Sequence, residues 1–328
     1  MNKKYIAMIV AGVLVIGGFC FFKLKSTSLK QALKTAEEYT SYELVCNMEM
    51  LENDELKSYQ VTSTYASLNN QDYYKVELYD KSLNQSQVIV RNKDGVFVLT
   101  PSLNQAFQFQ SEWPNNSPKP YIYQSLLSFF KDNKNEKVKD GYIVSGQMSY
   151  ENDDRVKSQE VKFDKELQPV YVNVYDENGT EIIQLTVTSF TANQKSEESA
   201  FNQETIMKES KNQYTSAASS LPLYPVALMG STLENEKVST IDDITNHILK
   251  FTGDKSFTIV ESAVSSKDTM NVVTINSEMI DLIDGFAYQE ENQMTYVSSG
   301  VVCSLYSNDL TKEEMLSVLS SMQAANVK

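Results

Sequence analysis

Cysteine and histidine are scarce in this sequence. Its 328 residues include three cysteines and one histidine. Three cysteines in a chain of this length exclude a disulfide scaffold. The histidine, His247 in DDITNHILKF, has no cysteine or histidine partner at metal-ligand spacing. We therefore expect no metal site and no cofactor, and we interpret His247 as a structural residue.

The motifs of common catalytic sites are also absent. The sequence has no glycine-rich phosphate loop, no G-x-S-x-G elbow and no H-E-x-x-H helix. Asp153-Asp154 and Asp242-Asp243 lie in polar turns, where solvated acids are more common than a glycosidase pair. Cys46 and Cys303 fall on inward faces of expected strands, which indicates buried free thiols. The pattern favours a protein that is not an enzyme. A cell-envelope enzyme with an unrecognised active site is the alternative.

Charge is distributed unevenly along the chain. The formal net charge is -14, but residues 1–36 carry six lysines and no acid, so the remainder carries -20. Phosphate contacts need clustered lysine and arginine, so this acidic body argues against nucleic-acid binding. It would also repel anionic lipid headgroups, which leaves the N-terminus as the expected membrane contact.

One long uncharged run is present, YIAMIVAGVLVIGGFCFF from Tyr5 to Phe22. As a helix it would be about 27 Å long, close to the thickness of a bilayer core. Two lysines precede it, as in a secretory signal, but no good A-x-A cleavage site follows. We interpret residues 1–25 as an uncleaved, single-pass transmembrane signal-anchor, with the body of the protein on the extracytoplasmic side of the cell membrane.

Two observations bear on this interpretation. Phe19 precedes Cys20, where a lipoprotein signal needs a small residue, so we interpret Cys20 as an apolar anchor residue and keep its lipidation as the alternative. Four lysines follow the run and two precede it, and this count by itself favours a cytoplasmic body. Long domains, however, translocate despite flanking charge.

The next part of the chain, residues 26–192, predicts an antiparallel β domain with helices. Residues 26–40 have helical periodicity, and YELVCNMEML then alternates with period two. Further strands are expected at 58–67, 72–80, 85–92, 95–101, 105–112, 141–150, 155–164, 168–176 and 181–190, with an apolar helix at 121–132. Asp94-Gly95 between two apolar runs predicts a hairpin. Closely spaced strands of this kind indicate a meander, and not alternating strands and helices.

The remainder predicts a linker and a second domain. Residues 193–220 are polar and serine-rich, which indicates a linker with a short helix. Residues 221–328 begin with an extended entry and continue with short strands, among them NVVTINSE, GFAYQEE and VVCSLYS. The last helix has a capping box from Thr311 to Glu314. We expect a small C-terminal α+β domain, so the fold class is β-rich α+β.

Aromatic residues are the most informative feature of the first domain. Within FVLTPSLNQAFQFQSEWP and the helix YIYQSLLSFF, apolar side chains are expected to line one side of a curved sheet. They form either core beneath the helix or a cleft for an acyl chain or an apolar partner surface. The candidate cleft residues are Phe97, Leu99, Phe107, Phe109, Trp113, Tyr121, Leu126, Phe129 and Phe130.

The order of these parts resembles a known family. A short amphipathic helix, long meander strands, the segment QVIVRNKDGVFVLTPSLNQAFQFQ, a proline-rich loop and the helix YIYQSLLSFF resemble the periplasmic lipoprotein-carrier (LolA-like) fold over residues 28–190. The tail, from YPVALMG to LTKEEMLSVLSSMQ, is similar to the second domain of RseB-like proteins and of Gram-positive sporulation and germination lipoproteins of the GerS and YdcC kind.

This resemblance implies a non-enzymatic extracytoplasmic binding protein. Its ligand would be a lipid or lipoprotein, or an envelope protein such as a cortex amidase, and it would act in sporulation, germination or envelope sensing. The poor lipobox departs from the family pattern, and an anchored protein does not shuttle as a free carrier. A purely structural envelope protein remains the other interpretation.

Overall fold

The computed structural model describes residues 28–52, 55–82, 84–115, 117–150, 152–210, 221–241, 244–263, 270–298 and 300–324. The expected anchor from Tyr5 to Phe22, with Cys20, lies outside this part of the chain. Among the described residues, no helix combines the length and apolar character needed to cross a membrane.

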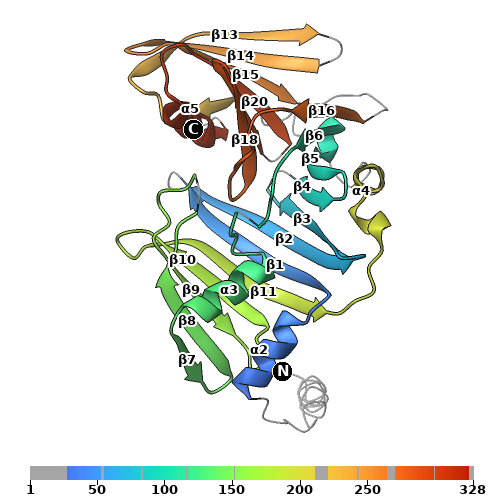
Figure 1. Cartoon of the computed structure of the whole chain (residues 1–328). Helices are drawn as coiled ribbons and strands as arrows, with labels where there is room; N and C mark the ends of the chain where they lie inside the picture. The colour runs from blue at the N-terminus through green and yellow to red at the C-terminus, as the bar shows by residue number, and fades with distance from the viewer. Residues whose placement is uncertain are drawn as a thin grey trace, which may run out of the picture.

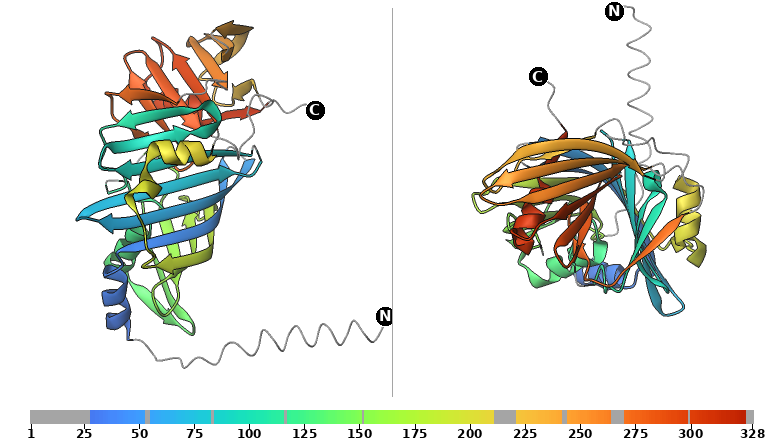
Figure 2. Two further views of the ribbon diagram at one scale, coloured as in Figure 1. Left: turned by 90° about the vertical axis from the view of Figure 1, so that its right-hand side faces the viewer. Right: turned by 90° about the horizontal axis from the view of Figure 1, so that it is seen from above.

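A large curved sheet forms the first part of the molecule (Figures 1 and 2). Its order is β16-β6-β5-β4-β3-β2-β1-β11-β10-β9-β8-β7, and all neighbours are antiparallel except β16 and β6. The strands are β1 (Ser41–Glu52), β2 (Glu55–Leu68), β3 (Gln71–Asp80), β4 (Gln85–Asn92), β5 (Gly95–Thr100), β6 (Gln105–Phe109), β7 (Asn135–Val138), β8 (Gly141–Gln147), β9 (Ser158–Phe163), β10 (Pro169–Tyr175), β11 (Glu181–Ala192) and β16 (Asn271–Ile275). The curved antiparallel sheet predicted from the sequence is confirmed.

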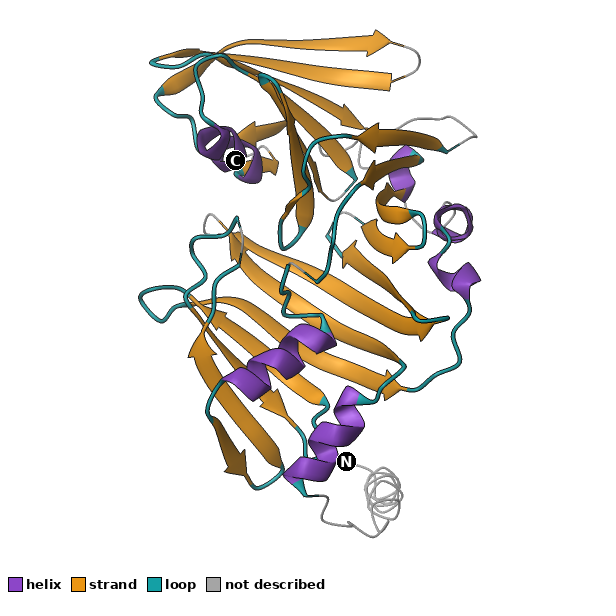
Figure 3. Ribbon diagram, in the orientation of Figure 1, coloured by secondary structure: helices purple, strands orange, loops and turns teal. Residues whose placement is uncertain are grey.

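Helices cover both faces of this sheet (Figure 3). The inner face lies beneath α2 (Leu29–Glu37) and α3 (Tyr123–Asp132). On β1, alternate side chains from Tyr42 to Met50 are buried beneath them, Cys46 included, because successive residues of a strand point to opposite faces. The outer face is partly covered by η2 (Glu198–Phe201) and α4 (Gln203–Ser210), whose apolar side chains contact β4 and β5. The short helix expected between 193 and 220 therefore lies against the first sheet.

A second, seven-stranded sheet lies above the first in Figure 1, in the order β13-β14-β15-β20-β19-β18-β17. Its strands are β13 (Ser231–Ile241), β14 (Ile244–Gly253), β15 (Phe257–Ala263), β17 (Ile280–Asp281), β18 (Gly285–Glu290), β19 (Gln293–Ser298) and β20 (Val301–Tyr306). A strand pair, β12 (Leu223–Pro225) with β21 (Met322–Ala324), and helix α5 (Lys312–Ser320) close its core. The predicted capping box from Thr311 to Glu314 is confirmed.

Strand β16 connects the two parts in a way that the sequence pattern does not indicate. It follows β15 in the chain, yet it pairs in parallel with β6 at the edge of the first sheet. Its Ile275 is buried in the core of that sheet. The C-terminal residues therefore complete the first sheet as well as forming the second.

Glu261 on β15 is a fully buried acid in the second part. One of its oxygens, Oε2, accepts a hydrogen bond from the Leu223 backbone N–H at 2.8 Å, and Oε1 has no partner among the described residues. Burial raises the pKa of Glu261 to about 8, although the hydrogen bond from Leu223 acts in the opposite direction. This carboxyl group is therefore protonated in the folded protein at neutral pH.

We expect the free energy of unfolding to fall as the pH rises from 4.5 to 8. In this range the unfolded Glu261 has released its proton and the folded one retains it, so unfolding releases a proton. The slope that Glu261 contributes to the free energy of unfolding approaches about 1.4 kcal/mol per pH unit. Urea unfolding at a series of pH values measures it. Glu261→Gln should flatten the profile, and Glu177→Gln in an exposed turn should not; equal slopes in all three proteins would contradict this assignment.

Candidate functional site: a cavity beside helix α3

A cavity of about 520 Å³ opens beside α3 on the inner side of the first sheet. This volume lies within the range of small-molecule sites in proteins. Four segments form its wall: α3, the loop before it, one residue of β3 and the end of β8. The lining residues are Tyr74, Pro114, Asn115, Pro118, Ile122, Gln124, Ser125, Ser128, Phe129, Asp132, Asn133, Gln147 and Met148.

Helix α3 presents two different faces. Leu126, Leu127 and Phe130 are buried against the sheet, which fixes the helix on its inner face. The polar residues Ser128 and Asp132 are four apart, so they lie on one side of the helix, and both line the cavity. The sequence shows the apolar side of this helix clearly, but it does not indicate that the polar side borders a cavity.

The loop between β6 and α3, residues 113–121, forms another wall. Trp113 is fully buried, and its ring makes an edge contact with Tyr74 at a centroid distance of 6.3 Å. After it, Pro114 and Pro118 line the cavity. Because proline fixes the backbone torsion angle φ, these two residues stiffen the wall on this side.

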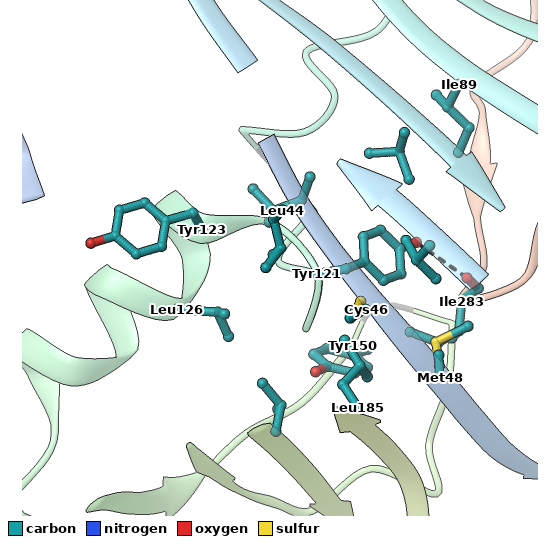
Figure 4. Close-up of a cluster of buried hydrophobic side chains, with 14 of the residues drawn as sticks. Leu44, Cys46, Met48, Ile89, Tyr121, Tyr123, Leu126, Tyr150, Leu185 and Ile283 are labelled. Atoms are coloured by element: carbon teal, nitrogen blue, oxygen red, sulfur yellow. Dashed lines mark hydrogen bonds between the residues drawn. The ribbon is translucent and has the colours of Figure 1, made fainter. Parts of the chain in front are cut away.

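The same loop also holds the second part of the molecule. Lys119, 2% exposed, forms an ion pair of 3.2 Å with Asp281, and its ammonium group donates a hydrogen bond to the Leu282 carbonyl at 3.0 Å. The Ser117 hydroxyl also donates to Asp281. Tyr121 donates to the Ile283 carbonyl at 3.1 Å, and Figure 4 shows this bond beside the buried side chains of β1. One short loop therefore borders the cavity and anchors the second sheet.

A second buried acid, Asp284, strengthens the contact between the two sheets, which we call the joint. The carboxylate of Asp284 accepts hydrogen bonds from the Lys57 ammonium at 3.1 Å and from the Tyr59 hydroxyl at 3.0 Å, both on β2. Burial alone would raise the pKa of Asp284, but Lys57 and Tyr59 outweigh it and hold that pKa below its ordinary value. Phe286 then packs between Phe107 and Phe109 of β6, with ring centroids 5.1 and 5.4 Å away.

The lining of the cavity is about half polar and half apolar, and it is nearly uncharged. It has one acid, Asp132, and no lysine, arginine or histidine. The Tyr42 hydroxyl donates a hydrogen bond of 2.8 Å to Gln124 Oε1, which holds that side chain at the wall. Burial raises the pKa of Tyr42 well above its ordinary value, so this hydroxyl remains a donor at neutral pH.

The structure places the sequence-predicted cleft residues in several different surroundings. The nine residues are all buried. The expectation that Phe97, Leu99, Phe107 and Phe109 share one side of the sheet is wrong. The register pairs Val98 with Phe107 on one face, so Phe97 and Leu99 lie on the opposite face.

The nine candidates have different neighbours in the structure. Phe97 and Leu99 contact the outer helices, whereas Phe107 and Phe109 contact Phe286. Trp113, Tyr121, Leu126 and Phe130 belong to the inner core. Phe129 alone among the nine lines the cavity. The amide residues of the wall were missed because nothing in their local sequence distinguishes them from solvated surface residues.

Reactive groups do not gather at this cavity. Among the described residues, no three histidine, cysteine, aspartate or glutamate side chains are placed to hold a metal ion. Cys46 and Cys303 are buried free thiols, as predicted, and burial raises the pKa of Cys46 to about 12. Asp153 forms an ion pair of 2.8 Å with Arg155. The arrangement can bind a molecule, and its described side chains offer no activated nucleophile.

Comparison with known proteins confirms the resemblance to sporulation proteins of the YdcC kind. The chain is 29% identical over 340 positions to the sporulation protein YdcC of Bacillus subtilis (strain 168), and the alignment covers 99% of each chain. No protein-family model matches the chain.

Two solved structures have a similar outline. The Pseudomonas aeruginosa MucA/MucB complex shares 11% identity, with a TM-score of 0.32 over 89% of this chain and 96% of the other. A putative outer membrane lipoprotein-sorting protein domain from Vibrio parahaemolyticus shares 13% identity, with a TM-score of 0.31 over 56% and 98%.

Proposed function

We propose that this chain is a non-catalytic binding protein that holds an apolar ligand or an envelope protein in the cavity beside α3. The observation that carries the proposal is the cavity itself. An open recess of about 520 Å³ is bordered by a helix fixed on a sheet and by a proline-rich loop, and among the described residues no reactive groups gather at its wall. A rigid, preformed recess suits binding because little conformational entropy is lost when it is filled.

We further propose that the body works outside the cell membrane on an N-terminal anchor. The uncharged run from Tyr5 to Phe22 supports the anchor. The strongly acidic remainder supports a body that stays clear of anionic lipid surfaces. The name of the Bacillus subtilis relative supports a role in sporulation.

Filling the cavity tests this proposal. Ser128 is exposed on the cavity side of α3, so Ser128→Trp should occupy the recess without disturbing the core. We expect the full chain, extracted from membranes in mild detergent, to carry a bound protein or lipid, and this variant to lose at least 90% of it. Native mass spectrometry of the purified protein measures the bound material.

A matched control excludes a general effect of tryptophan. Ser189 is exposed on β11, away from the cavity, so Ser189→Trp should retain the bound material. A wild-type protein that carries nothing, or two variants that retain the same ligand, would contradict the proposed site.

A further inference from the structure

The cavity wall offers both hydrogen-bond donors and acceptors that the protein leaves free. The Gln124 oxygen is engaged by Tyr42, so its amide N–H groups are free to donate. The Asn133 amide donates to the Phe129 carbonyl at 3.0 Å, so its oxygen is free to accept. The side chains of Asn115 and Gln147 also line the cavity; both are exposed to solvent and make no hydrogen bond to another described residue. Four amide side chains thus present both kinds of polar group to one space.

The charge of the wall disfavours an anionic ligand. A carboxylate or phosphate placed here would lose water and meet no cation, because the lining contains no lysine, arginine or histidine. Asp132 would repel it in addition. The headgroup of a fatty acid or of an anionic phospholipid is therefore a poor fit.

The open amides also disfavour a hydrocarbon chain. An acyl tail would cover these polar groups and take their hydrogen bonds to water without replacing them. A polypeptide backbone, by contrast, carries one donor and one acceptor at nearly every residue. The lining residues Ile122, Phe129 and Met148 offer apolar surface, which uncharged side chains of a bound polypeptide can contact between the amide hydrogen bonds.

We propose that the cavity binds an uncharged segment of polypeptide, whose backbone amides pair with the side-chain amides of the wall. This inference rests on the proposed function and narrows its ligand to one class. The partner would be an envelope protein that presents an extended, uncharged stretch. The strongly acidic body of this chain also disfavours an acidic partner.

Binding measurements with defined probes test the ligand class. Peptides of 12 residues would be selected from a random displayed library on the full chain in detergent, then synthesised for titration. Palmitate and vesicles of dioleoylphosphatidylglycerol would be titrated in parallel. We expect uncharged peptides to bind, Ser128→Trp to abolish their binding, and Gln147→Ala to weaken it about fivefold, the loss of one hydrogen bond. Gln110→Ala, at an exposed glutamine outside the cavity, should leave the affinity unchanged.

The lipid titrations separate the possible failures. Palmitate or vesicle binding to the wild-type chain that Ser128→Trp abolishes, with no peptide bound, would overturn the peptide class and leave the proposed function standing. Binding of no probe, or peptide binding that Ser128→Trp does not reduce, would overturn the proposed function together with this inference.

Discussion

Replacing Lys119 with methionine should lower the free energy of unfolding by about 3–5 kcal/mol, the usual cost of breaking a buried ion pair by removing one partner. Both charged side chains are nearly inaccessible, with 1% of Lys119 and 5% of Asp281 exposed. Without the lysine, the carboxylate stays buried with the Ser117 hydroxyl as its remaining hydrogen-bond partner among the described side chains. Urea denaturation of the purified chain measures the loss.

Removing both charges should recover most of this stability. In Lys119→Met combined with Asp281→Leu, no uncompensated charge is buried, and such replacements are often neutral or stabilising. The control is Lys34→Met, because Lys34 pairs with Glu38 at the surface and such pairs contribute little. A Lys119→Met variant within 1 kcal/mol of wild type would show that this ion pair does not hold the joint.

Replacing Phe286 with alanine should cost about 3–5 kcal/mol, the usual range for a buried phenylalanine. Phe286 is fully buried, and its ring contacts Phe107 and Phe109 across the joint between the two sheets. Because this contact joins the two sheets, we expect the wild type to unfold in one transition. The cavity left in Phe286→Ala would weaken the contact, so we expect two transitions in this variant.

The chain provides its own probe for this separation. Trp113 is the only tryptophan and lies in the inner core of the first part, so its fluorescence reports the unfolding of that core. Circular dichroism reports both sheets. In Phe286→Ala the two signals should change at different urea concentrations, whereas in Tyr306→Ala, at an exposed position of β20, they should coincide. Coincident transitions at the wild-type midpoint in Phe286→Ala would contradict the proposed coupling.

The local pattern of apolar and turn residues in the sequence predicts most of the helices and strands. Alternation from Tyr42 to Met50 predicted a half-buried strand because a strand repeats every two residues, and the structure buries those positions. Asp94-Gly95 predicted the turn between β4 and β5, which pair from Asn92 and Gly95 onward. These signals depend on neighbours in the chain, so one sequence contains them in full.

Features that depend on distant pairing could not be predicted in the same way. Nothing in NVVTI indicates whether it pairs within the second sheet or, as found, with β6 of the first. The sequence pattern predicts one shared face for Phe97 and Phe107 because the turn at Pro101–Leu103 hides the register, which pairs Phe107 with Val98 and so places Phe97 on the other face of the sheet. Each error concerns strand register or partner choice, which a shift of one residue reverses.

The joint and the cavity could not be predicted either, because residues that are distant in the sequence form both of them. Lys119 and Asp281 are 162 positions apart, and each resembles a solvated surface charge in its own segment. The open amides of Gln124 and Gln147 acquire meaning only when α3 and β8 border one space. Buried polar groups therefore carry much of what distinguishes this molecule, and they are the groups that a sequence pattern describes least well.

Photo-crosslinking at the cavity in living cells tests the central claim most directly. Ser128→p-benzoylphenylalanine places a reactive group at the wall of the cavity, and Ser189→p-benzoylphenylalanine places the same group on the exposed side of β11. The account predicts that irradiation of intact cells gives one discrete adduct at Ser128, and none at Ser189. Absence of an adduct at Ser128, or the same products at both positions, would contradict the assignment of this cavity as the binding site.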